Sequence, residues 1–297
     1  MVGVNQAPAL ARGIEAVVRH DRRAVLFALA VVIGLAWVYL WRTAAAMDPA
    51  AMAAMPGMAD MPGMPGMSGM SGTSGMSGTV GVAAMVRAID PGALALTFVM
   101  WTVMMAAMML PSAAPAILLY GTLVRRHGER GSALPGVGLF AVAYLVVWTG
   151  FSAAATLLQA ALQNAALMTS QMALASSGLA AVALIAAGVW QVTPWKHACL
   201  HKCRQPLEFF MTRWRGGRSG ALRMGLEHGA YCVGCCWALM LLLFVAGVMN
   251  LAWVALISVF VLVEKLFPSV RYLSSAASAV LIGCGVALLA GVRLPGL

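Results

Sequence analysis

Charged residues are scarce in this chain. Only 9% of its 297 residues are charged, whereas soluble domains carry about 25%, and 62% are hydrophobic. The sequence also lacks a phosphate-binding loop, a dinucleotide-binding glycine motif, an ATPase phosphorylation segment and a Ser/His/Asp arrangement in a polar context. We therefore expect a chain that lies mostly in lipid. We expect neither an ATP-driven pump nor an enzyme, although thiol redox chemistry stays open.

The hydrophobic residues fall in seven stretches that approach the roughly 20 residues needed to span a bilayer. We place them near residues 24–41, 93–120, 134–158, 174–193, 230–248, 250–267 and 275–293. This pattern predicts an all-α fold, a polytopic helical membrane bundle with about seven transmembrane helices. The first stretch is expected to be a retained helix rather than a cleaved signal peptide, because no convincing cleavage site follows it.

The net charge of +10 is explained by topology, without a nucleic-acid partner. Most of the basic residues form four clusters, at Arg12–Arg23, at Arg125–Arg130, at Lys196–Arg223, and at Lys265 with Arg271. Loops rich in Lys and Arg stay in the cytoplasm. The expected topology therefore has the N-terminus inside and the C-terminus outside.

This topology divides the chain into three parts. Residues 1–42 hold the cytoplasmic N-terminus and the first helix, and residues 43–90 form an external segment rich in Met, Gly and Pro. Residues 91–297 form a six-helix membrane domain with a cytoplasmic Cys/His loop at 194–229. The external segment is expected to be disordered, because its composition cannot form a core.

Methionine recurs every third residue in the external segment. The seven positions are Met52, Met55, Met58, Met61, Met64, Met67 and Met70. A thioether is a soft, neutral ligand that favours Cu(I), so we interpret the tract as an external copper-capture segment. A plain flexible linker is the alternative, although a linker has no need of methionine.

The second stretch carries a further group of methionines, and two prolines follow it. The methionines are Met100, Met104, Met105, Met108 and Met109. The i, i+4 spacing aligns them along a helix, where thioethers offer Cu(I) ligands without burying charge. Pro111 and Pro115 are expected to break or kink the helix just beyond and to free backbone carbonyls. The alternative is that these methionines only fill gaps in the packing.

Cysteine and histidine gather near the expected cytoplasmic face. The candidate ligands are His197, Cys199, His201, Cys203, His228, Cys232, Cys235 and Cys236. On a helix, His197 pairs with His201 and Cys199 with Cys203. Thiolate and imidazole suit copper, and zinc remains a second candidate at this inner cluster. The Cys-x-x-Cys-Cys group is expected at the cytoplasmic mouth of the fifth span, whereas Cys284 is expected to be a small core residue.

Two ionisable residues close the sixth stretch. Glu264 is a candidate to face the bundle, where it would neutralise a metal cation or a lysine. Lys265 is expected to extend to the membrane interface.

Three motifs resemble those of the DUF2182 family, predicted metal-binding integral membrane proteins of bacteria. They are Met104 to Ser112, then Gln191 to Lys196 with Cys199 and Cys203, and the run from His228 through Cys235-Cys236-Trp237 to Glu264-Lys265. The resemblance covers about 93–270 and implies a multi-pass, metal-binding protein of the bacterial inner membrane. Members are sometimes labelled copper chaperones. The layout is also similar to that of eukaryotic copper transporters, which place methionines outside and His/Cys ligands inside.

The leading hypothesis is Cu(I) acquisition, from the external Met tract through the second-span methionines to the inner Cys/His site. The first alternative is a membrane metallochaperone or cuproenzyme assembly factor without transport. The second is a membrane thiol oxidoreductase. The expected partners are the lipid bilayer, copper ions and a copper chaperone or client cuproenzyme, and an oligomer is open.

Overall fold

The computed structural model describes residues 7–46, 90–126, 133–169, 172–267 and 272–292. These residues are helical apart from short connections and one isolated β-bridge, between Met168 and Leu174. The all-α prediction is therefore confirmed for the described part of the chain. The methionine tract from Met52 to Met70 lies outside the described residues.

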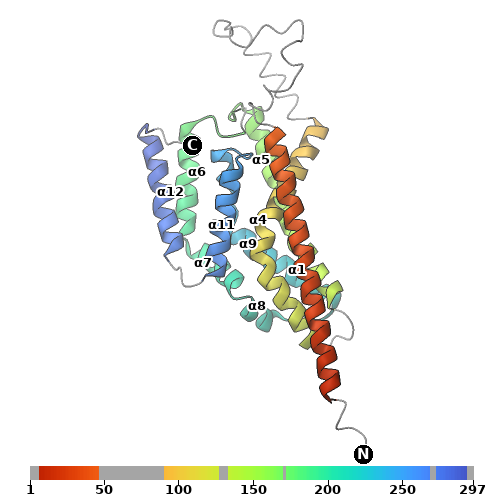
Figure 1. Cartoon of the computed structure of the whole chain (residues 1–297). Helices are drawn as coiled ribbons and strands as arrows, with labels where there is room; N and C mark the ends of the chain where they lie inside the picture. Colours follow the sequence, from red (N-terminus) through yellow and green to blue (C-terminus); the bar gives the residue numbers. More distant parts are fainter. Residues whose placement is uncertain (1–6, 47–89, 127–132, 170–171, 268–271, 293–297) are drawn as a thin grey trace, which may run out of the picture.

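The helices form an elongated bundle (Figure 1). In chain order they are α1 (Ala7–Ala46), α4 (Pro91–Arg126), α5 (Leu134–Asn164), α6 (Ser177–Gln191), α7 (Pro194–Arg204), α8 (Pro206–Arg213), α9 (Gly217–Leu241), α10 (Leu243–Ala246), α11 (Leu251–Leu266) and α12 (Leu273–Leu289). Helix α4 packs against α1, α5 and α11, and α9 packs against α5 and α7. The short helices α7 and α8 lie at the end of the bundle at which α1 begins (Figure 1).

Four helical segments in the described part are long and apolar enough to cross a membrane. They are Arg22–Ala45, Pro91–Arg126, Leu134–Asn164 and Gly217–Ala246. A fifth span results if α6 and α7, which meet at a bend of 62°, are taken together. Helices α11 and α12 have 16 and 17 residues. The polytopic helical membrane fold is confirmed, while the number seven and the orientation of the termini stay predictions.

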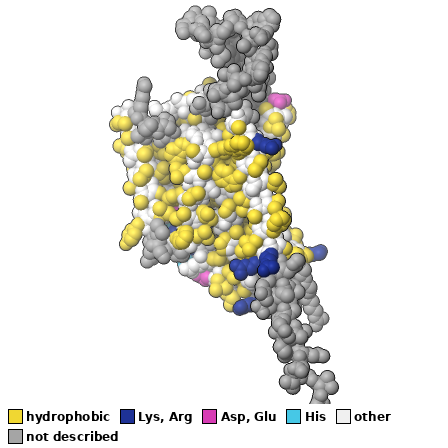
Figure 2. Space-filling view, viewed as in Figure 1, with side chains coloured by type: hydrophobic (Ala, Val, Ile, Leu, Met, Phe, Trp, Pro, Cys, Tyr) yellow, Lys and Arg dark blue, Asp and Glu magenta, His cyan; other side chains and the backbone are white. Residues whose placement is uncertain are grey.

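The surface agrees with a membrane environment. Large hydrophobic side chains such as Leu35, Leu96, Leu157 and Val182 are exposed on the outside of the bundle. Figure 2 shows hydrophobic side chains between the two ends, with Lys and Arg mainly at the end that carries α7 and α8. Exposed apolar side chains in such numbers are stable when lipid covers them.

The bend between α6 and α7 follows from two adjacent residues. Pro194 has no backbone N–H, so it is favoured in the first turn of a new helix. Thr193 caps that helix, because its Oγ1 accepts a hydrogen bond of 3.3 Å from the backbone N–H of Lys196. The result is that α7 leaves the direction of α6 and lies against α9.

Two expected breaks are helical in the structure. Helix α4 continues through Pro111 and Pro115 to Arg126, so the prolines do not end it. The segment 194–229, expected as a loop between spans, consists of α7, α8 and the first half of α9. Consequently the Cys-x-x-Cys-Cys group lies well inside α9, not at the start of a span.

Small residues bring α5 and α9 close together. A Cβ added at Gly225 would lie 2.4 Å from the Phe140 carbonyl oxygen, and one at Gly229 would lie 3.0 Å from Val147. Only hydrogen fits at Gly225, and a Cβ at Gly229 would require Val147 to shift; such close approach is the usual reason for glycine at membrane helix contacts. This contact holds the middle of α9 against the core of the bundle.

Candidate metal centre

The methionines of α4 are all buried. Met100 is 6% exposed, and Met104, Met105, Met108 and Met109 are at most 1% exposed. Methionine in a helix is free to pack on lipid, so the uniform burial shows that this face of α4 is directed into the bundle. The thioethers therefore form a sulfur-rich strip along the inside of α4.

The cysteines of α9 are buried too. Cys232, Cys235 and Cys236 are each 1% exposed, because residues at i, i+3 and i+4 share one helical face. The thiols of Cys235 and Cys236 lie 3.1 and 2.9 Å from the backbone oxygen of Cys232 and donate to it. The expectation that these thiols sit at the mouth of a span is wrong, since they lie inside the bundle.

The two groups of sulfur atoms meet. The Cys236 thiol lies 3.9 Å from the thioether sulfur of Met109. Two sulfur ligands of one d¹⁰ metal ion, each bonded at about 2.3 Å, lie about 4 Å apart in tetrahedral or trigonal geometry. Met109 and Cys236 thus have the separation that a shared metal ion requires.

Cys232 is surrounded by polar groups from two other helices. The ammonium of Lys265, on α11, donates to its sulfur at 2.9 Å, and the Tyr144 hydroxyl, on α5, lies at the same distance. The Lys265 ammonium also donates to the Ser112 hydroxyl at 3.1 Å. A positive charge so close stabilises a negative charge on sulfur, and the thiolate is the form that binds metals. The expectation that Lys265 extends to the interface is wrong, since its side chain is buried.

Helix α7 brings two further cysteines to α9. The Cys203 thiol lies near those of Cys232 and Cys235. Cys199, one turn earlier, packs on Gly234, where an added Cβ would lie 2.8 Å from its sulfur. Both residues are half-buried. Cys199 and Cys203, four residues apart, therefore both lie on the side of α7 that faces α9.

The histidines occupy other places. His197 and His201 are exposed on the opposite side of α7, so the structure does not join them to the cysteines. His228, one turn before Cys232 on α9, is 3% exposed and lies among the rings of Phe140, Tyr144 and Phe209. Its Nδ1 has no hydrogen-bond partner among the residues described. It is the only one of these three imidazoles that lies near the sulfur atoms.

Glu264 is bound to a lysine rather than to the thiols. Its carboxylate forms a buried ion pair with Lys196 and accepts a hydrogen bond from Ser274. Lys196 also donates to the Gln191 side chain, and the Arg204 guanidinium donates to the Glu264 backbone oxygen at 2.7 Å. This network ties α7 to α11. The sequence left two partners open for Glu264, a metal cation or a lysine, and the structure places it beside a lysine.

Cys284 lies apart from the other cysteines. It is half-buried on α12 and lines an apolar cavity between α6, α9, α11 and α12. Its surroundings are those of a small packing residue.

The geometry favours a soft metal ion with few ligands. Within the described ranges, no three His, Cys, Asp or Glu side chains are arranged so that they could hold a metal ion. A thioether and a thiolate are soft ligands. We define Met109, Cys232 and Cys236 as the sulfur centre.

A comparison with known families agrees with this chemistry. The model of the PpoB2 family, described as copper chaperone, matches residues 98–288. The chain belongs to this copper chaperone family. It is the DUF2182 family whose motifs the sequence resembles, so that prediction is confirmed. The match spans most of α4 to α12, whereas the Met tract precedes it. Searches of curated proteins and of solved structures gave no match.

Family membership supports a copper-related function for this membrane protein. Sequence reasoning missed two contributors to the sulfur centre, Lys265 and Tyr144. The sequence prediction places Lys265 at the interface, although a lysine next to Glu264 at the end of an apolar stretch is a signal for buried charge. Tyr144, in a stretch with no other polar neighbours, gave no signal of its own.

Proposed function

We propose that this protein binds Cu(I) at the sulfur centre inside the membrane and hands it to an acceptor, as a membrane copper chaperone. The observation that carries the proposal is the 3.9 Å separation of the Met109 and Cys236 sulfur atoms. They belong to different helices, so the bundle itself sets their separation. The role we propose is binding and transfer, not catalysis.

The ligand types support Cu(I) as the cargo. Thioethers are neutral and soft, so they bind Cu(I) without requiring a compensating charge in the membrane. Thiolates bind it more strongly, and Cys199 and Cys203 lie on α7 at the end of the bundle (Figure 1). We propose that copper leaves the sulfur centre through these two residues toward a chaperone or a client cuproenzyme.

Transport is a second candidate, favoured by the length of the methionine strip. Met100, Met104 and Met108 continue the sulfur-rich face of α4 away from the thiols. In this second proposal the external Met52–Met70 tract captures Cu(I), the strip passes it along, and the cysteines receive it. Softness increases from thioether to thiolate, so the transfer would need no ATP.

A flux measurement separates the two candidates. Purified protein is placed in liposomes loaded with a Cu(I) chelator, and Cu(I) entry is compared with Cu(I) binding. The test variant carries Leu at Met104, Met105, Met108 and Met109, and the control carries Leu at Met224 and Met240, which are buried on α9.

The outcomes are distinct. Binding without flux, weakened in the test variant only, supports the chaperone. Flux by the wild type that the test variant loses supports transport. If the wild type neither binds nor passes Cu(I), both candidates are wrong.

A further inference from the structure

In the described part of the chain, buried lysines outnumber buried carboxylates. Two lysines, Lys196 and Lys265, are buried, and the buried carboxylate among the described residues is that of Glu264. The Glu264 carboxylate forms its ion pair with Lys196. Within the described ranges no carboxylate forms an ion pair with Lys265. The Lys265 ammonium is therefore buried in the membrane domain, where its hydrogen-bond partners are sulfur and hydroxyl groups.

The place of that charge is well defined. The Lys265 ammonium donates to the Cys232 sulfur at 2.9 Å and to the Ser112 hydroxyl at 3.1 Å. Glu264, the adjacent residue on α11, binds Lys196 of α7 and Ser274 of α12 instead. The side chains of these two neighbouring residues thus contact different parts of the bundle, and that of Lys265 contacts the sulfur centre.

A fixed positive charge changes which metal ion the sulfur centre prefers. Cu(I) held by the thiolates of Cys232 and Cys236 and the Met109 thioether forms a complex of charge −1, which the ammonium brings to zero. A divalent ion on the same ligands forms a neutral complex, and the ammonium then leaves a net charge of +1. A net charge is costly in a low-dielectric interior.

We propose that Lys265 determines metal specificity, favouring Cu(I) over Zn(II) by supplying one positive charge beside Cys232. This inference rests on the proposed function, because it assumes that the sulfur centre binds copper. It assigns Lys265 as a positioning residue that does not ligate the metal. It also gives a physical reason why the sulfur centre would bind copper rather than zinc.

The test compares neutral and charged replacements of Lys265. Lys265→Met removes the charge, Lys265→Gln removes it but keeps hydrogen-bond donors for Ser112, and Lys265→Arg keeps it. Ser112→Ala removes the second partner of Lys265 and is the control. Cu(I) and Zn(II) affinities of the full chain in detergent are measured separately, by competition with chelators of known affinity.

The charge argument predicts the ratio of the two affinities. In Lys265→Met and Lys265→Gln the ratio should move toward Zn(II) by at least about tenfold, while Lys265→Arg and Ser112→Ala keep the wild-type ratio. Comparable thermal unfolding shows that a variant is folded, and Lys265→Gln serves if Lys265→Met does not fold. An unchanged ratio in a folded neutral variant overturns the inference. A wild type that binds no Cu(I) overturns the proposed function as well.

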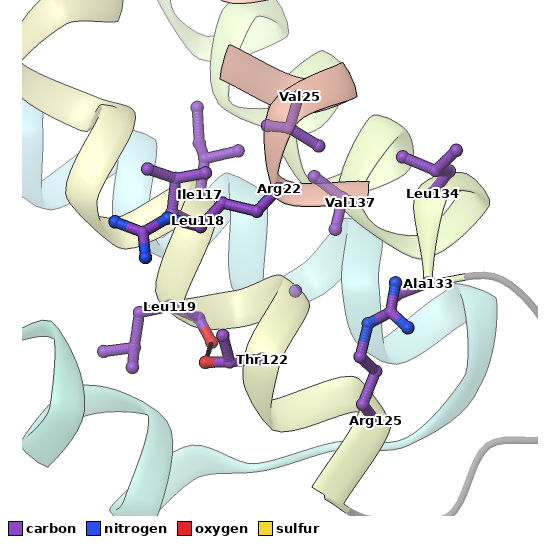
Figure 3. Close-up of a pocket in the computed structure, with 11 residues that line it drawn as sticks. Arg22, Val25, Ile117, Leu118, Leu119, Thr122, Arg125, Ala133, Leu134 and Val137 are labelled. Atoms are coloured by element: carbon purple, nitrogen blue, oxygen red, sulfur yellow. Dashed lines mark hydrogen bonds between the residues drawn. The ribbon is translucent and has the colours of Figure 1, made fainter. Parts of the chain in front are cut away.

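A separate observation concerns a cavity beside Arg22 of α1. A cavity of about 230 Å³ lies between α1, α4 and α5, lined by Arg22, Val25, Thr122, Arg125 and Val137, among others (Figure 3). Arg22 is the first residue of one apolar span and Arg125 lies at the end of another, and we expect the ends of such spans at the level of the lipid headgroups.

We infer that this cavity binds an anionic phospholipid. Its headgroup would lie between the guanidinium groups of Arg22, from α1, and Arg125, from α4, which Figure 3 shows on opposite sides of the view. One acyl chain would follow the apolar side chains of Val25, Leu134 and Val137. Basic pockets between membrane helices recognise lipid headgroups through this combination of charge and apolar surface.

Native mass spectrometry of the full chain tests the lipid site. With phosphatidylglycerol and phosphatidylcholine at equal concentrations, the wild type should retain phosphatidylglycerol. Arg22→Gln/Arg125→Gln should lose it, Arg22→Gln alone should weaken it, and Arg23→Gln/Arg126→Gln, which alters neighbours outside the cavity lining, should keep it. Equal retention of both lipids, retention unchanged in the double variant, or full displacement by inorganic phosphate would each overturn the inference.

Discussion

The thioether of Met109 and the thiol of Cys236 lie 3.9 Å apart although 127 residues separate them in the chain. Two further helices fix this contact. Tyr144, on α5, lies 3.4 Å from the Met109 backbone oxygen and 2.9 Å from the Cys232 sulfur. Lys265, on α11, bridges Ser112 of α4 and Cys232 of α9. The sulfur centre is thus held from four helices, which makes its geometry a property of the whole bundle.

Removing the Met109 sulfur should weaken copper binding without unfolding the protein. Met109→Leu conserves side-chain volume, and such swaps usually cost less than about 1.5 kcal/mol. We expect the Cu(I) affinity to fall by at least about tenfold, since disturbing a metal site typically costs that much. Competition with a Cu(I) chelator measures it. Met224→Leu, at another buried methionine, should keep wild-type affinity, and equal losses in both variants would contradict the role of Met109.

The cysteines should differ in importance. Cys236→Ser removes a thiolate ligand, so the Cu(I)–thiolate absorption band in the ultraviolet should decrease along with the affinity. Cys284→Ser, on α12 in an apolar environment, should change neither. A matching decrease in the Cys284 variant would mean that copper binds elsewhere in the bundle.

The buried Lys196–Glu264 pair should be important for stability. Lys196→Met leaves the Glu264 carboxylate buried without its counter-charge, which costs about 3–5 kcal/mol in buried pairs. Thermal unfolding in detergent should therefore shift strongly downward. The double variant Lys196→Met/Glu264→Leu should lose less than the sum of the two single variants, because their effects are coupled. Additive losses would show that the two side chains do not stabilise each other.

The contact between α5 and α9 should be sensitive to a single methyl group. Gly225→Ala places a Cβ 2.4 Å from the Phe140 carbonyl oxygen, and overpacking of this kind costs about 1–3 kcal/mol. Gly150→Ala, where no atom lies within 4 Å of the added Cβ, should be neutral or slightly stabilising, since alanine is the better helix former. Thermal unfolding of both variants, with Cu(I) affinity measured alongside, compares them directly. Equal stability of the two would contradict the close approach of α5 and α9.

The sequence predicted the architecture well where long apolar runs decide it. The stretches at 24–41, 93–120 and 134–158 lie within α1, α4 and α5, because a helix is the stable form of a long apolar segment in lipid. Helix ends were predicted less well. The basic segment that begins at Gly217 is predicted as part of a loop, but it forms the first turns of α9. Pro111 and Pro115 lie inside α4. Charge and proline content describe a residue's local preference, which tertiary packing overrides.

The candidate ligands were predicted as residue types but not as one site. Spacing placed Cys232, Cys235 and Cys236 on one helical face, and the same reasoning aligned the methionines of α4. Spacing within one helix does not reveal which faces of two helices meet. Only the packing of α4 and α9 decided that Met109 contacts Cys236, and that His197 and His201 point away from the cysteines of α7.

The sequence by itself determined a helical membrane protein, its copper-type ligands and its family, because these depend on composition and on short motifs. The tertiary structure alone decided the electrostatics of the sulfur centre. Glu264 and Lys265 are adjacent, yet one binds Lys196 and the other contacts Cys232. Successive residues of an α-helix point in directions about 100° apart, so neighbours in the sequence meet different helices, and their partners are fixed only when the bundle is packed.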